Sequence, residues 1–526
     1  MNVPKRPNVL WIGDEIADGL RSAVEALGLT VILTNVEGAE PERQNPHAVV
    51  MPFDGVTEEK FRGRLAHLLI RSLDSGALVT VLAQPHTDYE VASKLAMERV
   101  QVEDAHATDL RDVYPNFHVI HPDVRELARL LRDHNPGLAA DQHLVLQDHE
   151  GSTTPAEKLL LRRAFSGFDR IVLKPLSGGR SPDSKVWRVE AHAGERCCEP
   201  FVAKCARRLT LVEELNTWRE HVLNYIPFPF RAPPVPERFV TGATRALLVS
   251  MLASRAHRFD EYVATVKGPE LAIAALFDGA LRNWRRQSRP VRLQLGQVYT
   301  WEADQAERTR EADRRSGRLS RAVLPSRSSL TDAFELAKKR QSDVANPDVL
   351  WAMLAALPEL EYHECRMHGD LNPRNLFVRW NGVDIILIDF SHAGDWAPMS
   401  RDPSRLEVST AFDVFVKING EKQFLSDDIL NRFYRPPLLP PRIPASEDGR
   451  LEAVRQLRLL AGGEGIKNAE YATTTACHLL KYARAGSRTA SEVSEGEARR
   501  LRGLSYLLSA KLIQWLREGN NARGGD

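Results

Sequence analysis

The first 135 residues alternate short apolar runs with stretches of helical periodicity. The apolar runs lie at residues 9–12, 31–33, 48–51, 79–82 and 117–120. Amphipathic segments at residues 15–26 and 58–73 separate several of them. Apolar strands separated by amphipathic helices are typical of a parallel sheet covered on both faces. The pattern therefore predicts a doubly wound α/β domain over residues 1–135.

A second pattern follows residues 136–165, which we interpret as a linker and a lead-in helix. Thr154 is placed to cap that helix, with Pro155 at its first position and Glu157 three residues after the cap. Further apolar runs then lie at residues 171–173, 186–189, 201–203 and 246–251. Residues 166–255 are therefore predicted to form a strand-rich region.

The remaining residues, 256–526, show mainly helical periodicity. The exceptions are an apolar region at residues 378–390 and a proline-rich stretch at residues 435–447, which we interpret as an extended connector. Helical periodicity returns from residue 451 to about residue 517. These residues therefore predict a larger, helical region with one short strand segment.

Composition indicates a globular protein. The 526 residues include 71 Lys+Arg and 70 Asp+Glu, so the net charge of +1 excludes binding to nucleic acid or membranes through bulk positive charge. The five cysteines are odd in number and form no C-x-x-C pair, which argues against a disulfide scaffold or a structural zinc site. No apolar run approaches the roughly 20 residues of a membrane helix. We expect a cytoplasmic protein with no membrane partner.

One stretch of the helical region is locally basic. Residues 278–327 contain twelve Arg and six Asp+Glu. We interpret an insertion over about residues 278–340 as a solvated helical surface. The alternative is a binding surface for an acidic substrate or nucleic acid, although we do not expect a nucleic-acid partner.

The segment His-Gly-Asp-Leu-Asn-Pro-Arg-Asn, residues 368–375, carries the clearest chemistry. Asp370 and Asn375 lie five residues apart, and Asp389 ends an apolar run fourteen residues later. Phosphoryl transfer requires a carboxylate near the attacking hydroxyl, together with oxygen ligands that hold Mg²⁺ against the phosphates. The segment therefore predicts a phosphoryl-transfer site.

This segment resembles the aminoglycoside phosphotransferase and choline kinase family, whose members share a two-lobed protein-kinase-like fold. The resemblance implies that Asp370 is the catalytic base and that Asn375 and Asp389 are the Mg²⁺ ligands. It also implies supporting roles for His368 and Asp402, which would steady the loop. Two departures from the protein-kinase pattern, Gly369 in place of Arg and Ser391 in place of Gly, favour the small-molecule branch.

The strand-rich region supplies matching pieces in the order that this resemblance requires. Ser177, Gly178 and Gly179 form a glycine turn between two predicted strands, where backbone N–H groups could hold phosphates. Lys204 ends a Val-Ala-Lys run that resembles the phosphate-binding lysine strand. The same resemblance implies that Glu214 holds this lysine, with Glu220 as second choice, and that the backbone from Met251 to Ala253 meets the adenine of ATP. The predicted fold class is an α/β multidomain protein whose N-terminal domain precedes a two-lobed kinase-like α+β domain.

The N-terminal domain resembles a response-regulator receiver, which is flavodoxin-like. An acidic pair, Asp14 and Glu15, follows the first predicted strand. The position of the phospho-accepting aspartate is Pro52, with Asp54 two residues late, and no lysine follows the fifth strand. We therefore expect a degenerate receiver-like domain used for docking a protein partner or for homodimerisation.

The combined prediction is an enzyme that uses ATP and Mg²⁺ to phosphorylate a hydroxyl, which we expect to belong to a small molecule. The alternative is a pseudokinase-like nucleotide-binding switch or scaffold that acts through the receiver-like domain. The sequence leaves the acceptor open, as well as the choice between ATP and GTP.

Overall fold

The computed structural model describes residues 6–53, 59–83, 116–148, 151, 153–176, 184–252, 256–266, 268–316, 322–379, 382–442, 444–485 and 493–521. The chain forms two compact units. The first comprises Met1–Val212, Pro233–Ser254 and Ala312–Arg318, and the second comprises Glu213–Ala232, Arg255–Glu311 and Leu319–Asp526. Sheets and helices occur in both, so the protein is of mixed α/β type.

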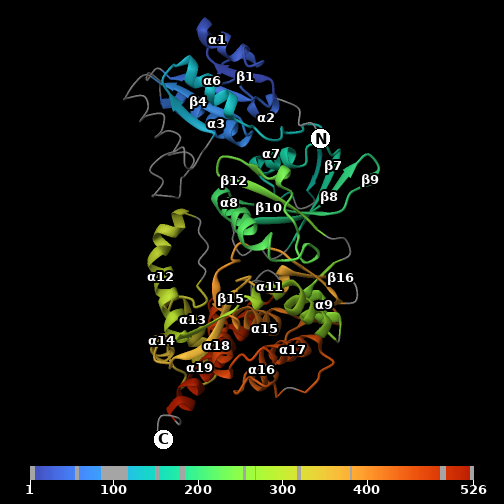
Figure 1. Cartoon of the computed structure of the whole chain (residues 1–526), viewed down its shortest axis with the longest axis vertical. Coiled ribbons are helices and arrows are strands. Elements are labelled where there is room, and N and C mark those ends of the chain that lie inside the picture. The colour runs from blue at the N-terminus through green and yellow to red at the C-terminus, as the bar shows by residue number, and fades with distance from the viewer. Residues whose placement is uncertain are drawn as a thin grey trace. The chain divides into compact units, whose positions relative to one another are not determined.

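A parallel sheet of five strands, which contains β1 and β4 as labelled in Figure 1, begins the first unit. Its strand order is β2-β1-β3-β4-β5. Its strands are β1 Asn8–Ile12, β2 Thr30–Thr34, β3 Ala48–Phe53, β4 Leu78–Ala83 and β5 Phe117–Ile120. Its helices within the described residues are α1 Asp18–Glu25, α2 Pro41–Gln44, α3 Glu59–Asp74 and α6 Val124–Asp133. All five predicted strands and the parallel sheet are confirmed.

Alternating side chains of this sheet enter two separate apolar clusters. Leu10 of β1 packs in a cluster with Leu68 of α3, whereas the neighbouring Val9 packs with Val24 of α1 and Leu127 of α6. Because successive strand residues point to opposite faces, helices cover the sheet on both sides. This agrees with the predicted doubly wound arrangement, while the resemblance to a receiver remains a prediction.

A second sheet of the first unit has the path β11-β12-β10-β8-β7-β6, with β9 paired to β8. Its strands are β6 Val145–Asp148, β7 Arg170–Pro175, β8 Lys185–Ala193, β9 Arg196–Cys197, β10 Phe201–Arg207, β11 Val240–Thr241 and β12 Arg245–Met251. The predicted apolar runs all form strands here. Strand β6 was not predicted: it lies within residues 136–165 and pairs parallel with β7. Part of the expected linker is therefore an edge strand of this sheet.

Helix α7, Pro155–Ala164, lies against the second sheet. Thr154 caps it and exchanges hydrogen bonds with Glu157, which confirms the predicted capping box. Leu160 and Leu161 are fully buried in one cluster with residues of β7, β8, β10 and β12. The lead-in helix thus belongs to the core of this sheet.

A buried seam joins the two sheets of the first unit. Arg163 of α7, which is 3% exposed, donates to the backbone oxygens of Asp74 and Thr241, both at 2.7 Å, and of Leu138 at 3.1 Å. The Asp74 carboxylate in turn accepts the backbone N–H of Ala243 at 2.7 Å. We call Arg163, Asp74 and Ala243 the seam. It fastens the end of α3 to the turn between β11 and β12.

Gly76 lies against the seam in a left-handed conformation, with φ +80°. A Cβ at this position would come within 2.3 Å of Arg163 Nη2 and 2.7 Å of the Pro136 oxygen. Contacts that short are repulsive, and the backbone conformation also disfavours other residues. Both constraints require glycine here.

The second unit is mainly helical and contains three small sheets. Its sheets are β13 His257–Arg258 with β16 Leu376–Arg379 and β17 Asp384–Leu387; β14 Arg289–Leu293 with β15 Leu360–Arg366 and β18 Trp396–Pro398; and β19 Val416–Ile418 with β20 Glu421–Gln423. Its principal helices are α9 Phe259–Thr265, α10 Glu270–Ala274, α11 Arg282–Arg286, α13 Thr331–Lys338, α14 Pro347–Ala355, α15 Arg401–Asp413, α16 Asp427–Phe433, α17 Gly449–Gly463, α18 Asn468–Ala485 and α19 Glu495–Asn521. Helices α8 Arg208–Thr217 and α12 Leu295–Ser316 have residues in both units. Short π-helical or 3-10 segments span Trp218–Val222, Phe228–Phe230, Ala275–Ala280, Ser328–Leu330 and Pro373–Asn375, and a further one, Pro236–Arg238, belongs to the first unit.

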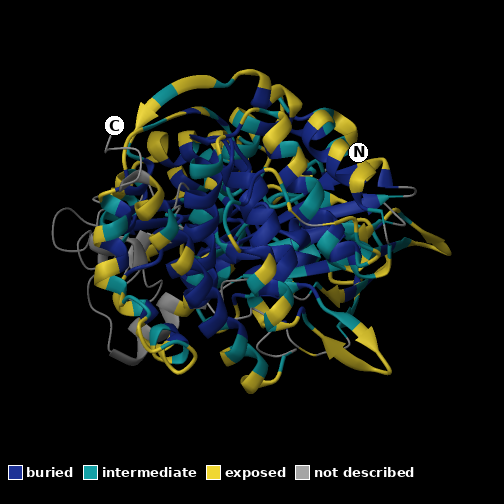
Figure 2. Cartoon of the chain, turned by 90° about the horizontal axis from the view of Figure 1, so that it is seen from below, coloured by how far each residue is buried: buried dark blue, intermediate teal, exposed yellow. Residues whose placement is uncertain are grey.

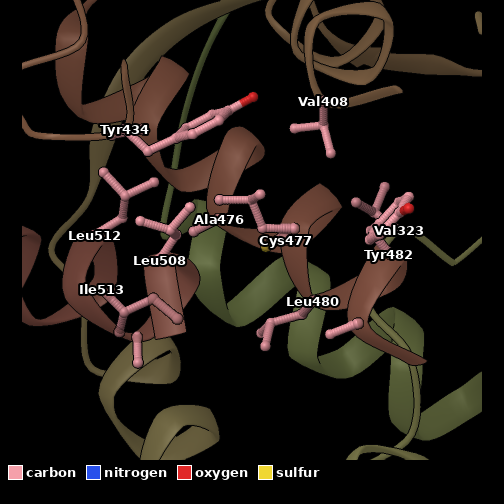
Figure 3. Close-up of a cluster of buried hydrophobic side chains, with 14 of the residues drawn as sticks. Val323, Val408, Tyr434, Ala476, Cys477, Leu480, Tyr482, Leu508, Leu512 and Ile513 are labelled. Atoms are coloured by element: carbon pink, nitrogen blue, oxygen red, sulfur yellow. The ribbon is translucent and has the colours of Figure 1, made fainter. Parts of the chain in front are cut away.

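The C-terminal helices supply the largest apolar core of this unit. Cys477 and Leu480 of α18 lie with Leu508 and Leu512 of α19 in the cluster drawn in Figure 3. Figure 2 shows buried residues in the interior and exposed ones along the outer faces of helices. The predicted helical tail is confirmed, and no described residue of 435–447 forms a helix or strand.

The arginine-rich stretch is not simply the solvated helical surface that we expected. Trp284 of α11 and Tyr299 of α12 are fully buried, and β14 forms a strand of the sheet with β15. Arg285 is 7% exposed and forms an ion pair with Glu464. Only part of the expectation fails: Arg282, Arg286, Arg289, Arg292 and Arg327 are exposed, whereas Arg285 can be buried because a carboxylate and a carbonyl oxygen satisfy it. Within the described residues, no helix combines the length and apolar character needed to cross a membrane.

Candidate active site

The hairpin of β16 and β17 positions the predicted chemical residues of the second unit. Leu376, the first residue of β16, pairs with Leu387, the last residue of β17. Beyond that pair, the backbone N–H of Ile388 donates to the Asn375 oxygen at 3.1 Å. Because Asp389 follows Ile388 directly, Asn375 and Asp389 lie at the same end of the hairpin.

Asp370 is buried, with 7% exposure, and is held from several sides. Its Oδ2 accepts a hydrogen bond from Asn372 Nδ2 at 3.2 Å, and its Oδ1 lies 3.4 Å from Arg405 Nη2. The Asn375 amide donates to the backbone oxygen of Asp370 at 2.9 Å. These contacts fix the carboxylate relative to the loop that carries it.

Asp402 of α15 binds the start of the same loop. Its two carboxylate oxygens accept the backbone N–H groups of His368 at 2.8 Å and Gly369 at 3.1 Å. Hydrogen bonds from two backbone donors to one carboxylate are strong and directional. The His368 ring, which is fully buried, also contacts the Ile388 oxygen through Nε2 at 3.0 Å. The loop is thus tied both to α15 and to the segment before Asp389.

Gly369 explains one departure from the protein-kinase pattern. Its φ is +80°, and a Cβ would lie 2.4 Å from the backbone oxygen of His392. An arginine at this position would therefore clash with the chain that follows Asp389. The close approach of these two backbone segments depends on the missing side chain.

Helix α15 is itself anchored where it begins. The backbone N–H of Ser400, which precedes the helix, donates to a carboxylate oxygen of Glu470 on α18 at 3.4 Å. Burial raises the pKa of Glu470 to about 7, and the hydrogen bonds from Ser400 partly oppose that rise. The positions of Asp402 and Arg405, which contact the loop from α15, therefore depend on the packing of α15 against α18.

The residues present fit a magnesium ion. The amide nitrogen of Asn375 donates to the backbone oxygen of Asp370, whereas its Oδ1 accepts no hydrogen bond from any described residue. Asp389 has φ +59°, and its Oδ1 accepts from the Ser391 hydroxyl at 2.9 Å. No group of three or more His, Cys, Asp and Glu suited to a metal occurs among the described residues. Mg²⁺ usually takes one or two protein carboxylates and completes its shell with phosphates and water, so a small set of oxygen ligands suffices.

The predicted nucleotide-binding residues are described only in part. Lys204 is half-buried at the middle of β10, paired with Val186 of β8 and Leu248 of β12. Met251 ends β12 and is 46% exposed, and Glu214 on α8 is 7% exposed. Ser177, Gly178, Gly179 and Ala253 lie outside the described residues.

Lys204 belongs to the first unit, whereas Glu214 and Asp389 belong to the second. The approach of Lys204 to either acid therefore stays a prediction.

Two residues that contact the Asp370 carboxylate, Asn372 and Arg405, were missed from the sequence. Asn372 lies inside the motif, but it was assigned no role. Arg405 lies three residues after Asp402 on the same helix, and residues three apart face the same side. That spacing was the available signal, and it was not used.

Comparison with known proteins agrees with this chemistry. Residues 172–402 match the phosphotransferase enzyme family. The match is somewhat less than half of the chain and includes Lys204 as well as the loop at Asp370. Over this stretch the protein is similar to phosphotransferases. No curated protein matches the sequence.

Several solved kinase structures are similar at low identity. An aminoglycoside phosphotransferase from Streptomyces rimosus is 15% identical, with TM-score 0.30, over 57% of this chain and 96% of that chain. A choline kinase from Cryptosporidium parvum is 10% identical, with TM-score 0.33, over 67% and 92%. An ethanolamine kinase from Plasmodium vivax is 10% identical, with TM-score 0.32, over 81% and 96%. Because these TM-scores are low, the function proposed below is based on the family match and the geometry of the loop.

Proposed function

We propose that this protein is an ATP-dependent phosphotransferase that transfers the γ-phosphoryl group to a hydroxyl of a small molecule. The observation that carries the proposal is the fixed carboxylate of Asp370, in a loop that Asp402 holds by two backbone N–H groups. The family match over residues 172–402 supports it. The two-lobed kinase-like fold is part of the same proposal.

In this proposal, Asp370 orients the acceptor hydroxyl and accepts its proton during transfer. Phosphoryl transfer needs little covalent work from a protein, so positioning and charge stabilisation supply most of the rate enhancement. Asn372 keeps one oxygen of Asp370 occupied, which directs the carboxylate. Asn375 and Asp389 would hold Mg²⁺, which when bound neutralises and orients the phosphates. Lys204, paired with Glu214, would bind the phosphates of ATP beside the turn at residues 177–179, and the backbone at Met251 and Ala253 would meet the adenine.

The N-terminal domain has a separate proposed role. Its strand order, β2-β1-β3-β4-β5, is the order of flavodoxin-like doubly wound domains. Pro52 occupies the position at which a receiver carries its phospho-accepting aspartate, and Asp54 lies outside the described residues. We therefore propose a degenerate receiver-like domain that docks a protein partner or a second copy of the chain rather than one that takes part in a phosphorelay.

The test combines nucleotide binding with turnover. Thermal unfolding of the full chain should shift upward by a few degrees with Mg²⁺ and ATP at about 100 times Kd. ADP release should then be measured with a panel of hydroxyl compounds that includes an aminoglycoside, choline and ethanolamine. Asp370→Asn should lower turnover by about 10²–10⁴-fold and leave the thermal shift intact.

The variants also separate the alternative of a nucleotide-binding scaffold. A scaffold would show the thermal shift, no ADP release with any acceptor, and no change in Asp370→Asn. Loss of the thermal shift in Lys204→Met, with a normal shift in the neighbouring variant Lys174→Met, would support the assigned lysine. Turnover that survives in Asp370→Asn would reject the assigned base.

A further inference from the structure

Arg405 is a buried cation next to the proposed base. It lies on α15, one helical turn after Asp402, and is 3% exposed. Its Nη2 atom lies 3.4 Å from Asp370 Oδ1. Removing a guanidinium from water is costly unless an acceptor compensates it. The burial of Arg405 therefore needs a reason in its surroundings.

Among the described residues, the side chain of Arg405 has Asp370 as its one hydrogen-bonding and ion-pair partner. Its Nε is buried and makes no hydrogen bond within those residues. A guanidinium offers five N–H donors, so most of its capacity is unused in this arrangement. Arg405 is thus placed poorly for stabilising the fold and well for contacting one carboxylate oxygen.

A second buried arginine, Arg458, pairs with α15 and has every guanidinium nitrogen hydrogen-bonded. Arg458 of α17 is 2% exposed and donates to both carboxylate oxygens of Glu407 at 2.7 and 3.0 Å. It also donates to the Phe433 oxygen at 2.7 Å, and Tyr471 donates to Glu407 at 2.6 Å. None of these contacts involves the loop at residues 368–375. Arg458 is therefore a matched control for a buried arginine with a structural role.

We propose that Arg405 is a positioning residue that sets the orientation of the Asp370 carboxylate. This inference rests on the proposed function, in which Asp370 is the base. One turn of α15 then holds the loop twice, because Asp402 binds its backbone and Arg405 binds its reactive side chain. Asn372 holds the other carboxylate oxygen, so both oxygens have a defined direction. Misplacing a reacting group by about 1 Å can cost about 10²-fold in rate.

The first experiment measures how Arg405→Met changes turnover with ATP, using acceptor-dependent ADP release or, without an acceptor, Mg²⁺-dependent ATP hydrolysis. We expect kcat to fall by about 10–100-fold while KM for ATP changes by less than about threefold. Arg405→Lys keeps the charge but not the fork geometry, and it should restore part of kcat. Each variant is assayed at a temperature where near-UV circular dichroism shows it to be folded.

The same substitution in the Asp370→Asn background isolates the route of the effect. If Arg405 acts through Asp370, adding Arg405→Met to Asp370→Asn should lower the residual rate by less than about threefold. An equal loss in both backgrounds would overturn the inference, because Arg405 would then act independently of the base. Unchanged turnover in Asp370→Asn alone would instead reject the assigned base, and no ADP release from the wild-type protein with any acceptor would reject the proposed function, so these failures are distinguishable.

The control and a structural readout complete the test. Arg458→Met should lower thermal stability but leave kcat within about twofold in folded protein, unlike Arg405→Met. A crystal structure of Arg405→Met should show the Asp370 carboxylate rotated or in several conformers, whether or not activity is found. An Asp370 side chain that keeps its wild-type orientation in that structure would overturn the inference.

Discussion

The seam in the first unit and the surroundings of the loop at residues 368–375 in the second each bury an arginine near an aspartate, but the two arginines are bonded differently. In the seam, every nitrogen of the Arg163 guanidinium donates to a backbone oxygen, the longest contact being 3.4 Å to Pro136. Beside the loop, Arg405 contacts one oxygen of Asp370, and its buried Nε–H has no acceptor among the described residues. In the seam, hydrogen bonds satisfy the whole guanidinium, whereas the guanidinium of Arg405 is directed at one carboxylate oxygen.

The contrast indicates how a buried charge can be assigned a role. Full satisfaction by backbone oxygens holds two segments together at little energetic cost, since each polar group regains a partner. Partial satisfaction by one reactive carboxylate costs stability and is expected where function requires a fixed geometry.

The largest effect on stability should come from Arg163→Met. The change takes a donor from the backbone oxygens of Asp74, Thr241, Pro136 and Leu138, of which, within the described residues, only Leu138 keeps another donor, Arg6. It also removes the cation beside Asp74, so we expect a loss of about 3–5 kcal/mol in the free energy of unfolding. Urea denaturation measures this loss. The exposed Lys158 on the same helix provides the control, since Lys158→Met should change stability by less than about 0.5 kcal/mol. A loss below about 1 kcal/mol for Arg163→Met would contradict the importance of the seam.

Asp402→Ala removes the carboxylate through which α15 binds the backbone of the loop at residues 368–375, and it should mainly affect the rate. It leaves the N–H groups of His368 and Gly369 without their acceptor, so the loop shifts and kcat should fall by about 10²-fold. Asp402→Asn keeps one acceptor oxygen and should give a smaller loss. Steady-state kinetics at saturating ATP measures both. Full activity in Asp402→Ala would show that α15 does not position the loop.

Gly76→Ala probes how closely the seam is packed. The left-handed conformation alone costs a non-glycine residue about 1 kcal/mol, and the approach of the new Cβ to Arg163 should add about 1–2 kcal/mol. Gly28 also has a left-handed conformation, at φ +75°, but a Cβ there would meet nothing within 4 Å. Chemical denaturation should therefore show a larger loss for Gly76→Ala than for Gly28→Ala. Equal losses would mean that Arg163 gives way easily.

The smallest expected effect is a pH dependence at Asp74. Burial raises the pKa of Asp74 from 3.8 to about 6, although the N–H of Ala243 and the Arg163 charge partly oppose the rise. The folded state thus binds this proton more tightly than the unfolded chain does. Its contribution to stability is complete below about pH 4 and is lost as the pH rises to about 6.

Asp74→Asn removes this titration while it keeps an oxygen that can accept from Ala243. The difference in free energy of unfolding between Asp74→Asn and wild type should therefore increase between pH 4 and pH 7, by about 1–2 kcal/mol in favour of the variant. The pKa of His134 is lowered to about 4 by burial, which acts in the opposite direction over the same range. Because His134 is present in both proteins, its effect cancels in the difference. A constant difference across this range would contradict the prediction.

Much of the fold could be predicted because its signals are local. The apolar runs that became β1, β3 and β4 are continuous, and the cap at Thr154 needs only four neighbouring residues. Strand β6, Val145–Asp148, was missed although Leu144-Val145-Leu146 is an apolar run, because the run is short and lies in a stretch that we interpreted as a linker. Strand β14 was missed because it is rich in arginine and gains its place by pairing with β15, which lies far along the chain. The pairing partner of β14 cannot be found within a short window of sequence.

For the site, the amino-acid sequence identifies Asp370, Asn375 and Asp389 as candidates for the proposed chemistry from their types and spacing. The sequence also shows that residue 369 is glycine, but it does not give the reason that glycine is needed there. Only the tertiary structure decided how the carboxylates are held, because hydrogen bonds to Asp402 and the contact with Arg405 join residues more than thirty positions apart. Spacing along a chain specifies composition and periodicity, whereas the direction of a buried side chain depends on the groups that surround it in space.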